Sequence, residues 1–130
     1  MCTAITLKTN QFYFGRNLDY EYGYQEAVTI TPRDFIFHFR RLPPLEHHYA
    51  MIGMATVVDG YPLYFDATNE KGLSMAALNF PDNAVYQAVK EDKLNVASYE
   101  LIAWVLSRFQ SVDEAVKVLG EVNITNQCFR

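Results

Sequence analysis

The residue with the clearest chemistry in this chain is Cys2, which directly follows Met1. Because cysteine is small, we expect an aminopeptidase to remove Met1 and leave Cys2 as the N-terminal residue. Its free α-amine would have an unperturbed pKa of about 7.7–8, and its thiol one of about 8.5. One residue would then supply a nucleophilic sulfur and a base, as when an N-terminal amine activates a neighbouring nucleophile. The alternative is that Cys2 is a small, buried apolar residue.

A predicted hairpin returns charged residues to the neighbourhood of this sulfur. Residues 2–7 read as a strand, Thr9-Asn10 as a turn, and a second strand begins at residue 12. The hairpin would bring Arg16 and Asp19 beside the start of the first strand. A cation near a thiol favours the thiolate, and a carboxylate could hold an ammonium group or a thiol proton.

Asn79 is a candidate hydrogen-bond donor at the end of another predicted strand. It precedes Phe80-Pro81, where the proline turns the chain out of the sheet. An amide donor aimed at a developing oxyanion contributes about 2.7–4 kcal/mol to catalysis. The alternative is that Asn79 only caps the turn.

Taken together, these segments resemble the choloylglycine hydrolase family, whose members include bile salt hydrolases and penicillin V acylases. The resemblance begins with Cys2-Thr3-Ala4-Ile5 and Phe14-Gly15-Arg16-Asn17-Leu18-Asp19 and covers nearly the whole chain. Its further motifs are Ile30-Thr31-Pro32-Arg33, Tyr61-Pro62-Leu63-Tyr64-Phe65-Asp66-Ala67, Asn69-Glu70-Lys71-Gly72-Leu73, Leu78-Asn79-Phe80-Pro81, the stretch around Trp104, and Asn123-Ile124.

The resemblance implies a bacterial cysteine amidohydrolase that needs no cofactor. Cys2, Arg16, Asp19 and Asn79 occupy the matched catalytic positions, and Asn79 corresponds to an oxyanion-hole residue of bile salt hydrolases. Penicillin V acylases tend to carry tyrosine there, so the implied substrates are glycine- or taurine-conjugated bile salts. The tyrosine-rich loop at 20–24 borders the substrate pocket in the family, which makes Tyr22 and Tyr24 candidate substrate contacts. Their alternative role is surface aromatic packing.

Three other functions stay open on the sequence. The first is the same chemistry on penicillin V. The second is a catalytically incomplete fragment, or a ligand-binding or assembly module that keeps the fold without turnover. The third is a redox-sensing thiol protein that uses Cys2 and Cys128.

Composition fits one globular domain over residues 1–130, and the scattered basic residues are unlike a nucleic-acid-binding surface. The chain is half hydrophobic, with a formal net charge of −4 and a pI of about 5.3. We see no signal peptide and no apolar run near the ~18 residues of a membrane span, so we expect a cytoplasmic protein. Both cysteines are expected to be reduced, and no ligand spacing predicts a metal.

The periodicity predicts strands first and helices after them. Residues 96–109 are apolar nearly all round and predict a buried helix. Ser111 and Glu114 form a capping box for a second helix, which Gly120 ends. Strands are expected at 2–7, from 12, at 27–31, at 35–40, at 50–58 (buried), from 61, at 73–78 and from 123, with loops at 42–45 and 82–95.

This order predicts an α+β fold without βαβ alternation. The resemblance implies the αββα sandwich of N-terminal-nucleophile hydrolases, only partly completed by 130 residues. Members of the family are more than twice this length, and their second half supplies an asparagine and an arginine of the site. We therefore expect a truncation, a piece that joins a partner, or a homo-oligomer that covers the exposed sheet face.

Overall fold

A computed structural model describes residues 2–79 and 82–129 of the chain. The predicted removal of Met1, and the Phe80-Pro81 part of the turn after Asn79, lie outside the described residues. The elements run in the order β1 (Thr3–Lys8), β2 (Phe12–Asn17), β3 (Ala27–Thr31), β4 (Met51–Val58), β5 (Tyr61–Asn69), β6 (Ser74–Ala76), β7 (Leu94–Ala97), η1 (Ser98–Glu100), α1 (Leu101–Leu106), α2 (Val112–Leu119) and β8 (Val122–Thr125).

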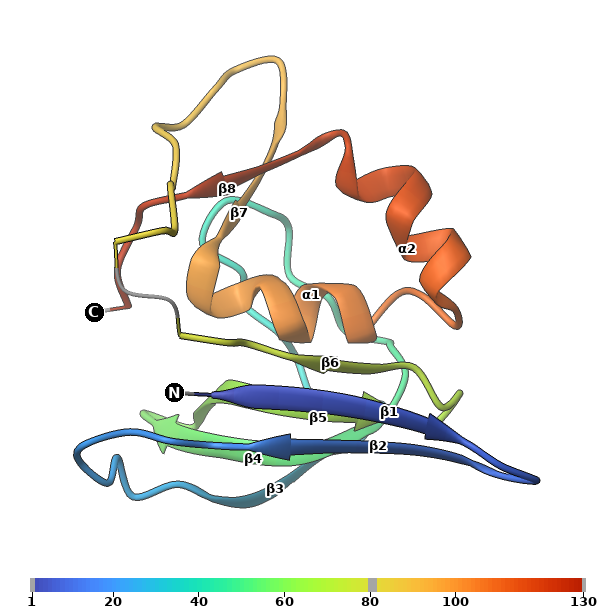
Figure 1. Cartoon of the computed structure of the whole chain (residues 1–130). Helices are drawn as coiled ribbons and strands as arrows, with labels where there is room; N and C mark the ends of the chain where they lie inside the picture. The colour runs from blue at the N-terminus through green and yellow to red at the C-terminus, as the bar shows by residue number, and fades with distance from the viewer. Residues whose placement is uncertain (1, 80–81, 130) are drawn as a thin grey trace.

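The central layer is an antiparallel sheet in the order β3-β4-β5-β6. Strands β4, β5 and β6 are joined by the two tight turns that the sequence predicts. Asp59 and Gly60 both have positive φ, as the two-residue turn between β4 and β5 requires. The β1–β2 hairpin forms a separate two-stranded sheet (Figure 1). The predicted α+β class is therefore confirmed.

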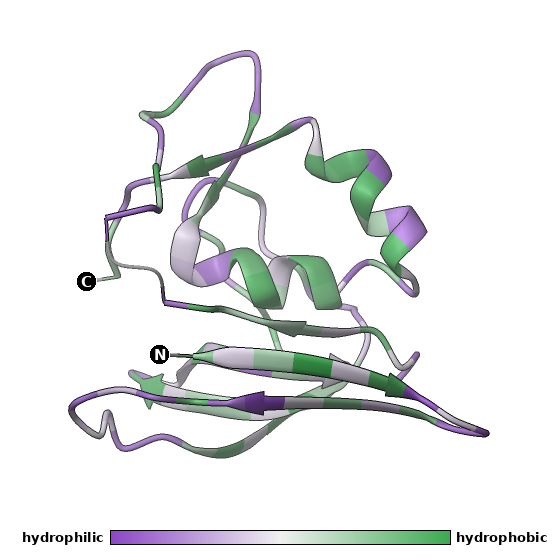
Figure 2. Ribbon diagram, in the orientation of Figure 1, coloured by the Kyte–Doolittle hydropathy of each residue, from purple (hydrophilic) through white to green (hydrophobic). Residues whose placement is uncertain are grey.

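The core lies on one face of the central sheet, where α1 packs against β5 and β6. Trp104 and Leu106 of α1 and Ala67 of β5 are among its fully buried members. The ribbon of α1 is hydrophobic along most of its length, whereas α2 alternates between apolar and polar residues (Figure 2). Asn69, buried at the end of β5, donates from Nδ2 to the carbonyls of Leu106 and Phe109 and so fixes the end of α1 to the sheet.

Three local predictions are corrected by the structure. Helix α1 begins at Leu101, because Leu94–Ala97 forms β7 and pairs in parallel with β8. A β-α-α-β crossover therefore exists at the C-terminal end. Residues 35–40 form one isolated bridge, Phe37 with Leu45, because the partner segment contains Pro43-Pro44, which has no N–H to extend a ladder. Strand β4 is buried on one face only, since Ile52 and Val57 are exposed.

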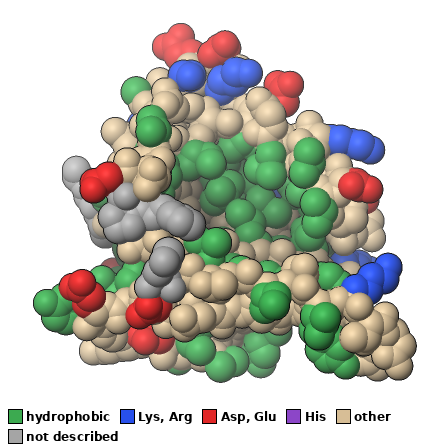
Figure 3. All heavy atoms as spheres, in the orientation of Figure 1, with side chains coloured by type: hydrophobic (Ala, Val, Ile, Leu, Met, Phe, Trp, Pro, Cys, Tyr) green, Lys and Arg blue, Asp and Glu red, His purple; other side chains and the backbone are tan. Residues whose placement is uncertain are grey.

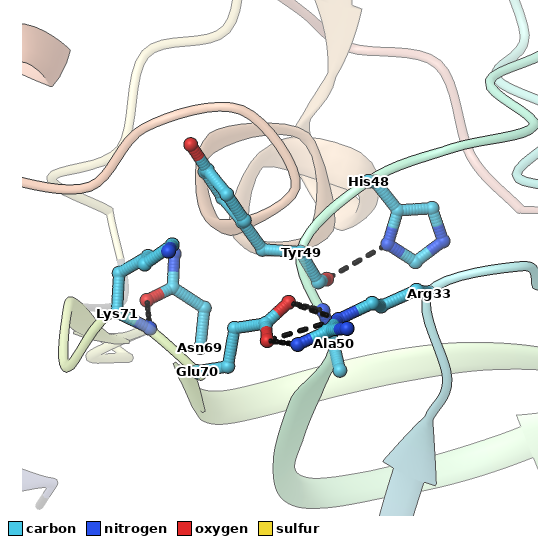
Figure 4. Close-up of polar contacts among 7 residues, drawn as sticks. All are labelled: Arg33, His48, Tyr49, Ala50, Asn69, Glu70 and Lys71. Atoms are coloured by element: carbon cyan, nitrogen blue, oxygen red, sulfur yellow. Dashed lines mark hydrogen bonds and ion pairs between the residues drawn. The ribbon is translucent and has the colours of Figure 1, made fainter.

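A charged cluster ties the loop after β3 to the turn after β5 (Figure 4). The Arg33 guanidinium donates to both oxygens of the Glu70 carboxylate, and Glu70 Oε1 also accepts from the N–H of Ala50 at 2.9 Å. Both ring nitrogens of His48 lie 2.8 Å from main-chain carbonyls, those of Phe35 and Tyr49. These contacts lock the long β3–β4 connection onto the sheet.

Many hydrophobic side chains are exposed on the surface of the structure. Hydrophobic side chains gather in a hollow of the face shown in Figure 3, where α1, α2 and the β7–β8 pair meet. On the face of the central sheet away from α1, Val28, Ile30 and Ile52 are exposed. None of the helices built by the described residues is long and apolar enough to cross a membrane.

Candidate active site

The β1–β2 hairpin brings three of the four predicted catalytic residues together. Its register pairs Ala4 with Arg16 and Thr3 with Asn17, so Cys2 lies opposite the chain that leaves β2. Cys2 is only 4% exposed, and its Sγ donates to the main-chain oxygen of Asp19 at 3.8 Å. The predicted hairpin is present, with Cys2, Arg16 and Asp19 at one end of it.

The surroundings of Cys2 favour the thiolate. Hydrogen bonding with the main chain of Asp19, and then with that of Asn79, lowers the pKa of the Cys2 thiol. Burial opposes them, and the positive charge of Arg16 lowers the pKa further. The net direction is downward, toward a thiolate at lower pH than for a free cysteine. Asn79, the fourth predicted residue, therefore meets the sulfur through its main chain.

Arg16 is held in a nearly enclosed position beside this sulfur. Its side chain is 7% exposed, Nη2 donates to the carbonyl of Ala77 at 2.5 Å, and Nε lies 3.5 Å from Asp66 Oδ2. Nε and Nη1 are buried without a hydrogen-bond partner among the described residues. Ala77 follows β6 and Asp66 belongs to β5, so the central sheet positions an arginine that the hairpin carries.

Asp66 is a site residue that sequence reasoning missed. It lies within the Tyr61–Ala67 motif of the family resemblance, but its position in a strand gave no sign of its contact with Arg16. A register shift in the β4–β5 pair matches Ala55 with Tyr64 and Met54 with Asp66, which leaves Phe65 as an extra residue. Such a β-bulge changes the direction of side chains and is frequent next to active sites.

Aromatic side chains form a cluster near the sulfur. The rings of Tyr20 and Tyr24 lie 5.4 Å apart, and those of Tyr20 and Phe65 lie 5.6 Å apart. Burial raises the pKa of the Tyr20 hydroxyl, and the nearby Cys2 thiolate raises it further. Tyr24, a predicted substrate contact, belongs to this cluster, whereas Tyr22 is 74% exposed. Tyr20 and Phe65 were not predicted, although both lie inside segments that the sequence singled out.

Open space is present next to the arginine. A cavity of about 400 Å³ is lined by residues of the hairpin and of the central sheet, among them Phe14, Arg16, Met54 and Asp66. No group of three or more histidine, cysteine or acidic side chains that could hold a metal occurs within residues 2–79 and 82–129. Cys2 and Cys128 are both free thiols, the first buried and the second exposed.

Comparison with known proteins decides the family. Residues 2–130 match the sequence profile described as linear amide C–N hydrolases, choloylglycine hydrolase family. The chain belongs to this family. The family prediction made from the sequence motifs is thereby confirmed.

Curated relatives and a solved structure agree with the assignment. The chain is 51% identical to a bile salt hydrolase/transferase of Lactiplantibacillus plantarum over 126 residues, which is 97% of this chain and 39% of the relative. It is 44% identical to a conjugated bile acid hydrolase of Lactobacillus gasseri, over 98% of this chain and 41% of the relative. A crystal structure of a mutant conjugated bile acid hydrolase from Clostridium perfringens superposes with a TM-score of 0.90 at 37% identity, covering 98% of this chain and 40% of that one.

The chain thus spans about two fifths of the length of these relatives. Within that span its fold is that of the conjugated bile acid hydrolase, and the αββα arrangement is only partly represented, as predicted. The described elements supply the helices, the four-stranded central sheet, and the two-stranded β1–β2 and β7–β8 sheets.

Proposed function

We propose that the chain is a cysteine amidohydrolase that cleaves the amide bond of glycine- or taurine-conjugated bile salts. The observation that supports this most is the environment of Cys2. A buried sulfur whose pKa is lowered by main-chain hydrogen bonds lies beside an arginine whose side chain is 7% exposed. These are the groups that acyl transfer through a thioester requires.

The reaction that we propose has two stages. Cys2 Sγ attacks the amide carbonyl carbon, and the tetrahedral oxyanion is stabilised by Asn79 and a main-chain N–H. The C–N bond then breaks, the nitrogen takes a proton, and glycine or taurine leaves while the acyl group stays on sulfur. Water attacks the thioester carbonyl, which releases the bile acid and returns the thiol. With Met1 removed, the α-amine of Cys2 would carry the proton between these steps.

Substrate class rests on the relatives and on two local features. The names of the relatives specify bile salts or conjugated bile acids. Asn79, rather than a tyrosine, occupies the position where the two branches of the family tend to differ. The ring cluster of Tyr20, Tyr24 and Phe65 offers an apolar surface close to the sulfur for a steroid body. Tyr22 stays a predicted substrate contact.

The test is release of glycine from glycocholate and of taurine from taurocholate by the purified chain, with penicillin V at equal concentration in parallel. Bile salt turnover that exceeds penicillin turnover supports the proposal. Faster release of the penicillin side chain would assign the other branch of the family.

A binding module without turnover is a second candidate, because the chain spans only about two fifths of its relatives. Titration calorimetry with taurocholate distinguishes it from the enzyme. Heat of binding without amine release would replace the catalytic proposal by the binding one.

We also propose that copies of the chain associate. The exposed apolar side chains on the outer face of the central sheet form a surface that proteins usually cover. The cytoplasmic location expected from the sequence stays a prediction.

A further inference from the structure

The pair formed by Arg16 and Asp66 is unusual because both charges are largely withdrawn from water. The Arg16 side chain is 7% exposed and that of Asp66 is 18% exposed. A buried charge is stable only when it is paired or hydrogen-bonded. The Arg16 guanidinium also donates to the neutral carbonyl of Ala77.

The bulge in β5 is what directs Asp66 toward the hairpin. Neighbouring Ala67 and Tyr64 are buried on the core side of the sheet. Asp66 instead reaches Arg16 of β2 and accepts from the N–H of Met54 at 3.4 Å. The carboxylate is thus fixed by the sheet on one oxygen and presents the other to Arg16.

Gly53 keeps the strands close enough for this geometry. A Cβ at Gly53 would lie 2.0 Å from the main-chain oxygen of Asp66 and 2.5 Å from the Cα of Ala67. No side chain fits there without moving β5. The position of Asp66 relative to the hairpin is therefore set by the backbone of the sheet and not by a flexible side chain alone.

We infer that Asp66 is a positioning residue for the Cys2 nucleophile, which it serves by holding Arg16 beside the sulfur. The consequence of this positioning for amide hydrolysis rests on the proposed function. The effect of Asp66 on the pKa of the Cys2 thiol does not. The negative charge of Asp66 can by itself only disfavour a nearby thiolate. Its hold on Arg16 favours the thiolate, because the arginine charge stays next to sulfur. The direct effect and the positioning effect have opposite signs, so they can be separated.

The experiment measures alkylation of Cys2 by iodoacetamide across a pH range, with peptide mass spectrometry as readout and no substrate present. Exposed Cys128 in the same sample is the internal reference. In Asp66→Asn, which keeps an oxygen for the Met54 N–H, we expect the Cys2 rate near neutral pH to fall about threefold to tenfold and its pH midpoint to rise. The rate at Cys128 should not change.

Two variants make the result specific. Asp59→Asn removes a carboxylate from the turn of the same β4–β5 hairpin and should leave the Cys2 profile unchanged. Asp66→Glu keeps the charge and should restore part of the parental rate. In an Arg16→Met background, Asp66→Asn should no longer slow alkylation, since nothing is left to position.

A Cys2 profile that is unchanged or moved to lower pH in folded Asp66→Asn overturns the inference, because only the direct charge effect would then be present. Should that variant not fold, Asp66→Ser takes its place, since it also removes the charge: a Cys2 midpoint above the parent's supports positioning, and an unmoved or lower midpoint overturns it. Because thiol reactivity is measured without substrate, a chain that does not hydrolyse amides can still confirm the positioning role of Asp66. Equally, a chain that hydrolyses amides can still fail the alkylation test.

Discussion

At the residue scale, Asn79 has two contributions that one substitution can separate. Its main chain lowers the pKa of the Cys2 thiol, and its side-chain amide is the proposed oxyanion donor. Asn79→Ala removes the amide and keeps the main-chain N–H. We expect kcat for taurocholate to fall about 10²- to 10³-fold, as for other oxyanion donors, with Cys2 alkylation unchanged.

Parallel loss of turnover and of thiol reactivity in Asn79→Ala would contradict this division, because it would mean that the side chain only maintains the local fold. Asn83→Ala, a few residues along the same connection, is a suitable control for effects on this loop.

The residues that a sequence reveals here are those whose chemistry shows in their type and position. Cys2 stands out at the N-terminus, and the hairpin pattern alone returns Arg16 and Asp19 to it. Asp66 does not stand out, because its contact depends on a bulge that breaks strict alternation along β5. A one-residue shift in register leaves no mark in composition or periodicity, so the partner of Arg16 had to come from the structure.

At the element scale, the close approach of β4 and β5 predicts that any side chain at Gly53 destabilises the fold. Gly53→Ala places a methyl group where backbone atoms of Asp66 and Ala67 lie, so we expect the free energy of unfolding to fall by about 3 kcal/mol. Denaturant unfolding measures this directly. In Gly15→Ala the new Cβ would meet only Ile5 Cγ2 at an ordinary 3.7 Å, so that control should be near neutral. Equal losses in the two variants would contradict the close approach.

The link between Arg33 and Glu70 predicts a specific dependence of stability on pH. The Arg33 hydrogen bonds, followed by the Ala50 N–H, lower the pKa of Glu70 from 4.5 to about 2. Because the folded pKa is depressed, this contribution is complete above about pH 4.5 and is lost as pH falls toward about 2. Glu70→Gln should therefore narrow the difference in unfolding midpoint between neutral pH and about pH 3.

If Glu70→Gln and the parent lose equal stability between neutral pH and about pH 3, the Arg33–Glu70 pair does not contribute to the free energy of unfolding. The exposed glutamate at position 121, in the turn before β8, provides the matched control as Glu121→Gln.

The local sequence pattern predicted most helices and strands, but it did not predict which strands pair over long sequence distances. The predicted cap at Ser111 is confirmed, since Ser111 Oγ accepts from the N–H of Glu114 at 3.3 Å and α2 begins at Val112. The Glu114 carboxylate accepts from the N–H of Gln110 at 2.9 Å and not from that of Ser111, so the reciprocal half of the predicted capping box is shifted by one residue. Residues 94–97 carry the apolar content of a buried helix, yet they pair with β8, which is more than twenty residues later. Tertiary pairing of this kind overrides local propensity. The periodicity of one segment does not reveal which distant strand it pairs with, or in which register.

At the scale of the whole molecule, the exposed apolar face of the central sheet predicts association. Ile30 and Ile52 are register partners on β3 and β4, and they are 68% and 49% exposed. We expect sedimentation to show a species larger than 15.0 kDa, and the double variant Ile30→Glu/Ile52→Glu to shift it toward the monomer. Val116→Glu, on exposed α2, should leave association unchanged. A parent that sediments as a monomer at all concentrations would contradict the proposal.

The central claim is that the sulfur of Cys2 carries the acyl group. The most direct measurement compares amine release from glycocholate and taurocholate by the parent, Cys2→Ala and Cys128→Ala, with folding of each checked by thermal unfolding. We predict turnover by the parent and by Cys128→Ala, and loss of at least about 10³-fold in Cys2→Ala. Turnover by folded Cys2→Ala within a few-fold of the parent, or its loss in Cys128→Ala alone, would contradict the account.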